Sequence, residues 1–170
     1  MKNECRLELL AELTGQELTK QPEEFGPYRV KQAFRAKETF AENTLFTQIR
    51  DELAEMLEEK IGTLALRPFS DTLHFTDMVV QTYQPGPVGI SAHRDGRGFV
   101  NLIAVSVLEG NARFCVCSDR SGADPFSIRN EPGDLILMRG PGFMGSDLQP
   151  FHFVDQVETK RTSFALRQRK

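Results

Sequence analysis

The hydrophobic pattern of the chain changes its period near residue 70, and this change limits the fold more than any single motif does. Over residues 44–62, TLFTQIRDELAEMLEEKIG, apolar residues recur every three or four positions until the run ends at a glycine, which is typical of an amphipathic helix. A shorter helix is expected over 6–13. Beyond residue 70 the sequence consists of short β-rich runs separated by Gly, Pro, Asp and Asn.

These runs predict eight strands, over residues 77–84, 88–93, 99–108, 112–118, 125–130, 134–140, 151–157 and 161–169. Eight short strands joined by tight turns favour a closed or double-sheet β core, with the helices covering one sheet. A chain of 170 residues can bury one sizeable core but not two. We therefore expect a single, mainly β domain, in which 1–70 is largely helical support and 71–170 is the core.

Charge and cysteine content narrow the function classes. The net charge is −3, and residues 1–60 carry thirteen acidic against nine basic side chains, so no basic field attracts nucleic acid or an anionic membrane. No apolar run reaches membrane-spanning length, and the N-terminus lacks the apolar core of a signal peptide. Three scattered cysteines do not form a disulfide framework. These features predict a soluble, cytoplasmic protein with no membrane partner.

One short motif, ISAHRDGRG over 90–98, places a histidine and an aspartate two residues apart where a strand enters a glycine-rich turn. Because a strand has a period of two, His93 and Asp95 project from the same face. Two histidines and one carboxylate form the facial triad of non-heme iron sites. The third ligand is predicted to be His152, at the start of a later β run. Alternatively, Asp95 caps a turn and His152 is a core residue.

The last predicted strand, RTSFALR at 161–167, has one polar face and one apolar face. Arg161, Ser163 and Arg167 share the polar face. If that face looks into the core, its guanidinium groups require an anion, because an unpaired buried charge is costly. An arginine grips a carboxylate through two parallel hydrogen bonds, so a small dicarboxylate fits this position. Alternatively, the segment is a basic edge strand in solvent.

Taken in order, these motifs resemble the iron(II)- and 2-oxoglutarate-dependent oxygenases, whose core is a double-stranded β-helix (jelly roll). The resemblance rests on HRD at 93–95, His152 and RTS at 161–163, and covers roughly the last hundred residues. A second arginine six residues after the first, with TYQPG at 82–86, is most similar to the AlkB-like branch. The resemblance implies that His93, Asp95 and His152 bind Fe(II).

The same resemblance implies that 2-oxoglutarate and O2 are co-substrates. Arg161, with Ser163 and the Tyr83 hydroxyl, would hold the distal carboxylate of 2-oxoglutarate, and Arg167 would lie nearer its keto-acid end. The family members that halogenate have a small residue in place of the carboxylate ligand. Asp95 therefore favours hydroxylation or oxidative demethylation, with release of succinate and CO2.

The substrate is predicted to be a small molecule or a peptide. An AlkB-type nucleic-acid demethylase is a first alternative, but Gln81 stands where those enzymes tend to have asparagine, the N-terminal region is acidic, and the chain has no tryptophan for base stacking. A second alternative is a non-catalytic, cupin-like metal-binding module. Neither alternative requires a different set of metal ligands.

The segment 134–153, DLILMRGPGFMGSDLQPFHF, leads into the third predicted ligand through several glycines. It either forms a lid that moves over the metal or is a plain turn-rich connection. Arg139, Phe143 and Met144 are its candidate substrate-contacting residues.

Overall fold

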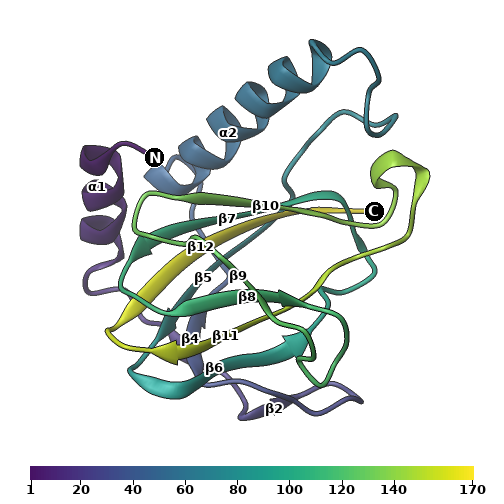
Figure 1. Ribbon diagram of the computed structural model, residues 1–170. Coiled ribbons are helices and arrows are strands. Elements are labelled where there is room, and N and C mark those ends of the chain that lie inside the picture. Colours follow the sequence, from purple (N-terminus) through teal and green to yellow (C-terminus); the bar gives the residue numbers. More distant parts are fainter.

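Two helices lie on one side of the molecule in the computed structural model, which describes all 170 residues (Figure 1). Helix α1 (Asn3–Leu13) begins three residues before the predicted start, and helix α2 (Leu45–Gly62) matches the helical period of the sequence. Thr44 caps α2, since its hydroxyl accepts a hydrogen bond from the Thr47 backbone N–H at 3.3 Å. Neither helix combines the length and the apolar character needed to cross a membrane.

All eight predicted strands are present, with small shifts at their ends. They are β5 (Asp77–Tyr83), β6 (Gly86–His93), β7 (Phe99–Glu109), β8 (Arg113–Cys117), β9 (Phe126–Ile128), β10 (Leu135–Arg139), β11 (Phe151–Val157) and β12 (Arg161–Arg169).

The region between the helices adds four short strands: β1 (Thr19–Lys20), β2 (Glu24–Phe25), β3 (Val30–Lys31) and β4 (Phe34–Lys37). Strands β1 and β4 extend a large sheet, whereas β2 and β3 form a separate hairpin. Strands of two to four residues are too short to show an alternating pattern, which explains why the sequence did not define them.

The longer strands form two antiparallel sheets that face each other (Figure 1). The larger sheet has the order β1-β4-β5-β12-β7-β10, and the smaller has the order β6-β11-β8-β9. Several neighbours, such as β5 and β12 or β6 and β11, are far apart in the sequence, as in a jelly roll. The prediction of a mainly β, double-stranded β-helix fold with N-terminal helices is confirmed.

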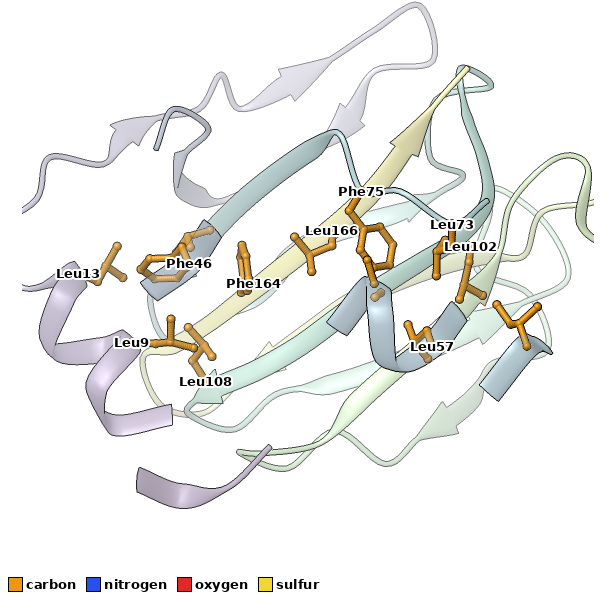
Figure 2. Packing of buried hydrophobic residues seen from close by; sticks show 14 of the residues in the cluster. Leu9, Leu13, Phe46, Leu57, Leu73, Phe75, Leu102, Leu108, Phe164 and Leu166 are labelled. Atoms are coloured by element: carbon orange, nitrogen blue, oxygen red, sulfur yellow. The ribbon is translucent and has the colours of Figure 1, made fainter. Parts of the chain in front are cut away.

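Strand β12 lies in the middle of the larger sheet and divides the core into two layers. Its outward side chains Phe164 and Leu166 pack against the helices together with Phe46, whose ring lies 5.0 Å from that of Phe164 (Figure 2). Its inward side chain Ala165 joins the apolar cluster between the sheets. The alternation of this strand therefore points Arg161, Ser163 and Arg167 between the sheets, which is the inward-facing of the two arrangements that the sequence left open.

Candidate active site

His93 ends strand β6, and its ring is held by the backbone of its own strand. The Nδ1 atom lies 2.8 Å from the Ser91 carbonyl oxygen. A carbonyl oxygen only accepts, so Nδ1 carries the proton and Nε2 keeps its lone pair. Burial and the neighbouring His152 lower the pKa of His93 to about 4, although Asp95 opposes the shift. His93 is therefore a neutral imidazole near pH 7, which is the form that binds metal ions.

His152 near the start of β11 is the register partner of His93 on the neighbouring strand. The two rings are 4.4 Å apart between centroids, and the ring of Phe114 stacks on the other side of His152 at 5.7 Å. The Nδ1 atom of His152 lies 3.4 Å from the Pro150 carbonyl oxygen, and its Nε2 atom lies on the side of Asp95. The pairing of β6 with β11 thus brings together two residues separated by 59 positions in the sequence.

Asp95 follows β6 and lies against both His152 and Arg167. Its Oδ2 atom is 3.6 Å from His152 Nε2, and its Oδ1 atom is 3.3 Å from Arg167 Nε. Burial opposes ionisation of Asp95, but His152, Arg167 and His93 outweigh it, so the pKa of the carboxyl lies below its ordinary value. Asp95 is therefore a carboxylate. In this arrangement no group of three or more His, Cys, Asp or Glu side chains has the geometry of a metal site.

Arg161 is the most unusual side chain of the site, because it is only 1% exposed and has no anionic partner. Its Nε and Nη2 atoms have no hydrogen-bond partner at all. The nearest favourable contact is the ring of Tyr83, 5.6 Å away between the guanidinium carbon and the ring centroid. Burial lowers the pKa of Arg161, although arginine remains charged in proteins. An unpaired buried guanidinium calls for an anion.

Tyr83 and Ser163 lie beside Arg161 on the inner face of the larger sheet. Tyr83 is the register partner of Arg161, and its hydroxyl donates to the Gln81 side-chain oxygen at 3.2 Å. Burial raises the pKa of Tyr83 to about 12, so the hydroxyl stays protonated and can donate. Ser163 is also buried and faces the same cavity. The Ser163 hydroxyl adds a donor beside the charge of Arg161, and the Tyr83 hydroxyl adds one when it turns away from Gln81.

Arg167 links the inner site to the outer end of the sheet. Its Nη1 atom donates to Asp77 Oδ1 at 3.0 Å, on the partner strand, while its Nε atom approaches Asp95. Phe99 covers the guanidinium at 4.9 Å. Asp77 has no role in the sequence interpretation, because its proximity depends on the pairing of Arg167 with Asp77 across 90 residues.

One cavity between the sheets is lined by all seven residues predicted to bind the metal and 2-oxoglutarate, which are Tyr83, His93, Asp95, His152, Arg161, Ser163 and Arg167. Its volume is about 40 Å³, because the side chains contact one another across it. The donor set of two imidazoles and one carboxylate suits Fe(II) and leaves coordination positions for other ligands. The unpartnered nitrogens of Arg161 suit a carboxylate in the same cavity.

The three candidate substrate residues are placed differently. Arg139 borders a small space beside Asp95 and His152, whereas Phe143 packs against Phe69 with a centroid separation of 6.1 Å. Met144 is 54% exposed, and its backbone N–H donates to the Pro68 carbonyl at 2.6 Å. The structure therefore brings only Arg139 close to the predicted ligands.

The turn η1 (Phe143–Gly145) is attached to the body of the protein. Besides the Met144 bond, the Gly140 N–H donates to the Asn101 carbonyl at 2.9 Å, and the Arg139 Nε donates to the Leu148 carbonyl at 2.9 Å. These bonds favour a fixed connection over a mobile lid.

No protein-family model matches this chain, and no curated protein matches it. Solved structures do match. A prolyl-4-hydroxylase from Pseudomonas putida is 15% identical, with a TM-score of 0.65 over 100% of this chain and 89% of that chain. A prolyl hydroxylase from Trichoplax adhaerens, solved with a peptide fragment of the hypoxia inducible factor oxygen degradation domain, is 13% identical, with a TM-score of 0.63 over 96% of this chain and 77% of that chain.

A viral collagen prolyl hydroxylase from Paramecium bursaria Chlorella virus-1, solved as a complex with 2-oxoglutarate, is 10% identical. Its TM-score is 0.63 over 98% of this chain and 90% of that chain. At these identities the likeness is one of fold, and it agrees with the double-stranded β-helix described above.

Proposed function

We propose that this protein is an Fe(II)- and 2-oxoglutarate-dependent dioxygenase that hydroxylates or oxidatively demethylates a small molecule or a peptide. The observation that carries the proposal is the buried, unpartnered guanidinium of Arg161 in the same cavity as His93, Asp95 and His152. A metal-binding module alone gives no reason to bury an uncompensated cation beside the metal ligands. A dioxygenase that must hold a dicarboxylate there gives that reason.

His93, Asp95 and His152 would hold the Fe(II). The backbone carbonyls of Ser91 and Pro150 orient the two imidazoles through their Nδ1 atoms, which leaves the Nε2 atoms for the metal. Arg167, whose Nε atom lies 3.3 Å from Asp95 Oδ1, favours the ionised form of Asp95. His93 as a neutral imidazole and Asp95 as a carboxylate are therefore already in the protonation states that metal binding requires.

Arg161 would bind the distal carboxylate of 2-oxoglutarate through its free Nε and Nη2 atoms, with the Tyr83 and Ser163 hydroxyls as further donors. The cavity must widen for this ligand, since about 40 Å³ is room for little more than a water molecule. Arg167 would hold the Asp95 carboxylate in place, and would approach the keto-acid end of 2-oxoglutarate from that side.

When bound, the metal and its co-substrates supply the oxidation of a substrate C–H bond. In the overall reaction a C–H bond, O2 and 2-oxoglutarate are converted to C–OH, succinate and CO2. One atom of the O2 enters the C–OH product and the other enters succinate. The chain itself binds and orients the reactants and excludes water between its two sheets. No further reductant is needed for this balance.

The solved prolyl hydroxylase that carries a peptide supports a small or extended substrate in a site of this fold. A nucleic-acid substrate remains the alternative, and the formal charge of −3 opposes it because phosphate binding relies on basic surface. Salt-sensitive binding to single-stranded DNA or RNA would favour this alternative.

The test is succinate formation from 2-oxoglutarate in the presence of Fe(II), ascorbate and O2, compared between the wild type and Asp95→Ala. The proposal predicts succinate release by the wild type, stimulated by a metabolite or peptide substrate, and a loss of at least about a hundredfold in the variant. Equal inactivity of both proteins, with tight iron binding by the wild type, would instead indicate the non-catalytic, cupin-like module.

A further inference from the structure

An apolar groove lies between the C-terminal half of α2 and strand β10, at the edge of the larger sheet. Its volume is about 570 Å³, within the range of small-molecule binding sites. Leu57 and Ile61 of α2 line one side, and Leu137 of β10 lines the other. Every lining side chain is apolar except Lys60 and Arg139. The groove therefore favours an apolar ligand over a sugar or a nucleotide.

Part of this apolar surface is open to solvent. Leu64, just after α2, is 55% exposed, and Leu137 is 45% exposed. A covering ligand would remove this apolar surface from water at about 25 cal/mol per Å². The exposure of adjacent leucines in one concave surface points to a binding site.

The groove shares part of its wall with the predicted active site. Phe114 and Met138 line both the groove and the cavity that contains His93 and Arg161. Met138, Arg139 and Pro150 also border the small space beside Asp95 and His152. A molecule in the groove would therefore be separated from the predicted metal ligands only by this layer of side chains.

The charge of the groove selects one class of ligand. Both of its ionisable residues, Lys60 and Arg139, are cations, and neither takes part in any of the ion pairs of the chain. Arg139 uses its Nε atom to bind the Leu148 carbonyl, and neither Nη atom makes a side-chain hydrogen bond. A guanidinium with free Nη atoms favours a carboxylate.

We propose that the groove is the substrate site and takes an elongated aliphatic carboxylate, with the carboxylate on Arg139 and the chain along α2. This inference rests on the proposed dioxygenase function, because it names the substrate class of that enzyme. Of the two cations of the groove, only Arg139 borders the predicted metal ligands, so the oxidised C–H bond lies within a few carbons of the carboxylate. The apolar stem of Lys60 contributes to the wall, and its ammonium group reaches solvent.

The test is calorimetric binding of decanoate and of decylamine, which differ in head-group charge, to the protein without metal. We expect decanoate to bind at least about tenfold more tightly than decylamine. Arg139→Gln should weaken decanoate binding about tenfold. The matched control is Arg35→Gln, since Arg35 is exposed and likewise donates its Nε to a backbone carbonyl, that of Leu18 at 2.9 Å.

A second pair of variants tests the apolar chain site. Leu64→Glu places a negative charge in the groove and should weaken decanoate binding about tenfold or more. Leu66→Glu is the control, because Leu66 is 67% exposed but does not line the groove. Equal binding of decanoate and decylamine, or equal effects of the two leucine variants, would overturn the proposal.

Two other occupants give different outcomes. If the groove is a contact between copies of the chain, sedimentation shows a dimer that Leu64→Glu dissociates. Decanoate then does no more than displace the second copy from the groove. If it takes an apolar peptide, peptides but not decanoate stimulate succinate release. Either result overturns the aliphatic carboxylate. Decanoate binding without any turnover of 2-oxoglutarate contradicts the dioxygenase function alone, whereas turnover without decanoate binding contradicts this inference alone.

Discussion

The guanidinium of Arg167 lies between two carboxylates, with its Nε atom 3.3 Å from Asp95 and its Nη1 atom 3.0 Å from Asp77. Asp95 is the predicted metal ligand, while Asp77 lies on the neighbouring strand at the end of the sheet. Arg167 therefore fixes the position of a ligand carboxylate through a contact outside the metal site. This contact makes Arg167 a positioning residue for the metal as well as a candidate for binding the keto acid.

Replacing Arg167 should weaken metal binding. Arg167→Gln removes the charge that holds Asp95 ionised and oriented, so the affinity for Mn(II), used as a redox-stable probe for Fe(II), should fall about ten- to a hundredfold. Titration followed by electron paramagnetic resonance of free Mn(II) measures this affinity. Arg169→Gln is the control, because Arg169 also pairs with Asp77, at 2.9 Å, but makes no ion pair with Asp95. Equal losses in both variants would assign the effect to Asp77.

Replacing Arg161 with an apolar residue should stabilise the protein while it abolishes co-substrate binding. The Arg161→Met variant removes a buried charge without a counter-ion and keeps a similar side-chain length, so the free energy of unfolding should rise by about 1 kcal/mol or more. Urea unfolding in a buffer without carboxylates or phosphate measures the change. A clear loss of stability would show that Arg161 is compensated within the fold and needs no ligand.

Glu58 predicts a dependence of stability on pH. Its carboxylate accepts a hydrogen bond from the Leu73 N–H at 2.9 Å and forms an ion pair with Arg67. These two contacts connect α2 to the segment that follows it. Burial raises the pKa of Glu58, but these two partners outweigh it, so its pKa in the folded protein lies below the ordinary 4.5. The unfolded chain therefore binds the proton first as pH falls, and this stabilisation is lost below pH 4.5.

The Glu58→Gln variant should lack this contribution. Urea unfolding at about pH 6 and about pH 3.5 should show a smaller decrease in stability on acidification for Glu58→Gln than for the wild type. Glu59 is exposed at the neighbouring position, so Glu59→Gln should lose as much stability on acidification as the wild type. If acidification lowers the stability of all three proteins equally, the contacts of Glu58 are not the cause of the pH dependence.

Gly110, in the turn between β7 and β8, should not tolerate a side chain. Its φ is +83°, and a Cβ atom there would lie 2.0 Å from the Lys160 carbonyl oxygen. Gly110→Ala should destabilise the protein by about 3 kcal/mol or more, measured by thermal and urea unfolding. Gly62→Ala is the contrasting variant, since nothing lies within 4 Å of a Cβ at this helical position and alanine favours the helix. Similar effects of both substitutions would contradict this account of the turn.

Much of the fold could be predicted from the sequence because its signals are local. The alternation in β12 separated Phe164 and Leu166 from Arg161 and Ser163, although it left open which face looks inward. The eight strands beyond residue 70 are bounded by turn residues, which made them visible in the sequence. His152 could be proposed as the partner of His93 only because the chain has few histidines. Their contact itself depends on which strands are neighbours, which the sequence does not show.

Other features depend on the three-dimensional arrangement and could not be predicted. The contact of Arg167 with Asp77 requires the register of β12 on β5. The apolar groove is formed by α2 and β10, whose separate patterns read as ordinary packing faces. The position of Met144, a candidate substrate-contacting residue, could not be predicted either, because the bond from its N–H to the Pro68 carbonyl is not visible in the sequence.

The most direct test of the account is calorimetric titration of 2-oxoglutarate, without oxygen, into the Mn(II)-loaded protein and into its Arg161→Met variant. The account predicts binding by the wild type that depends on the metal and falls by about a hundredfold or more in the variant, because the distal carboxylate loses its only buried cationic partner. Equal affinity in the two proteins, or no binding of 2-oxoglutarate to the metal-loaded wild type, would contradict the account.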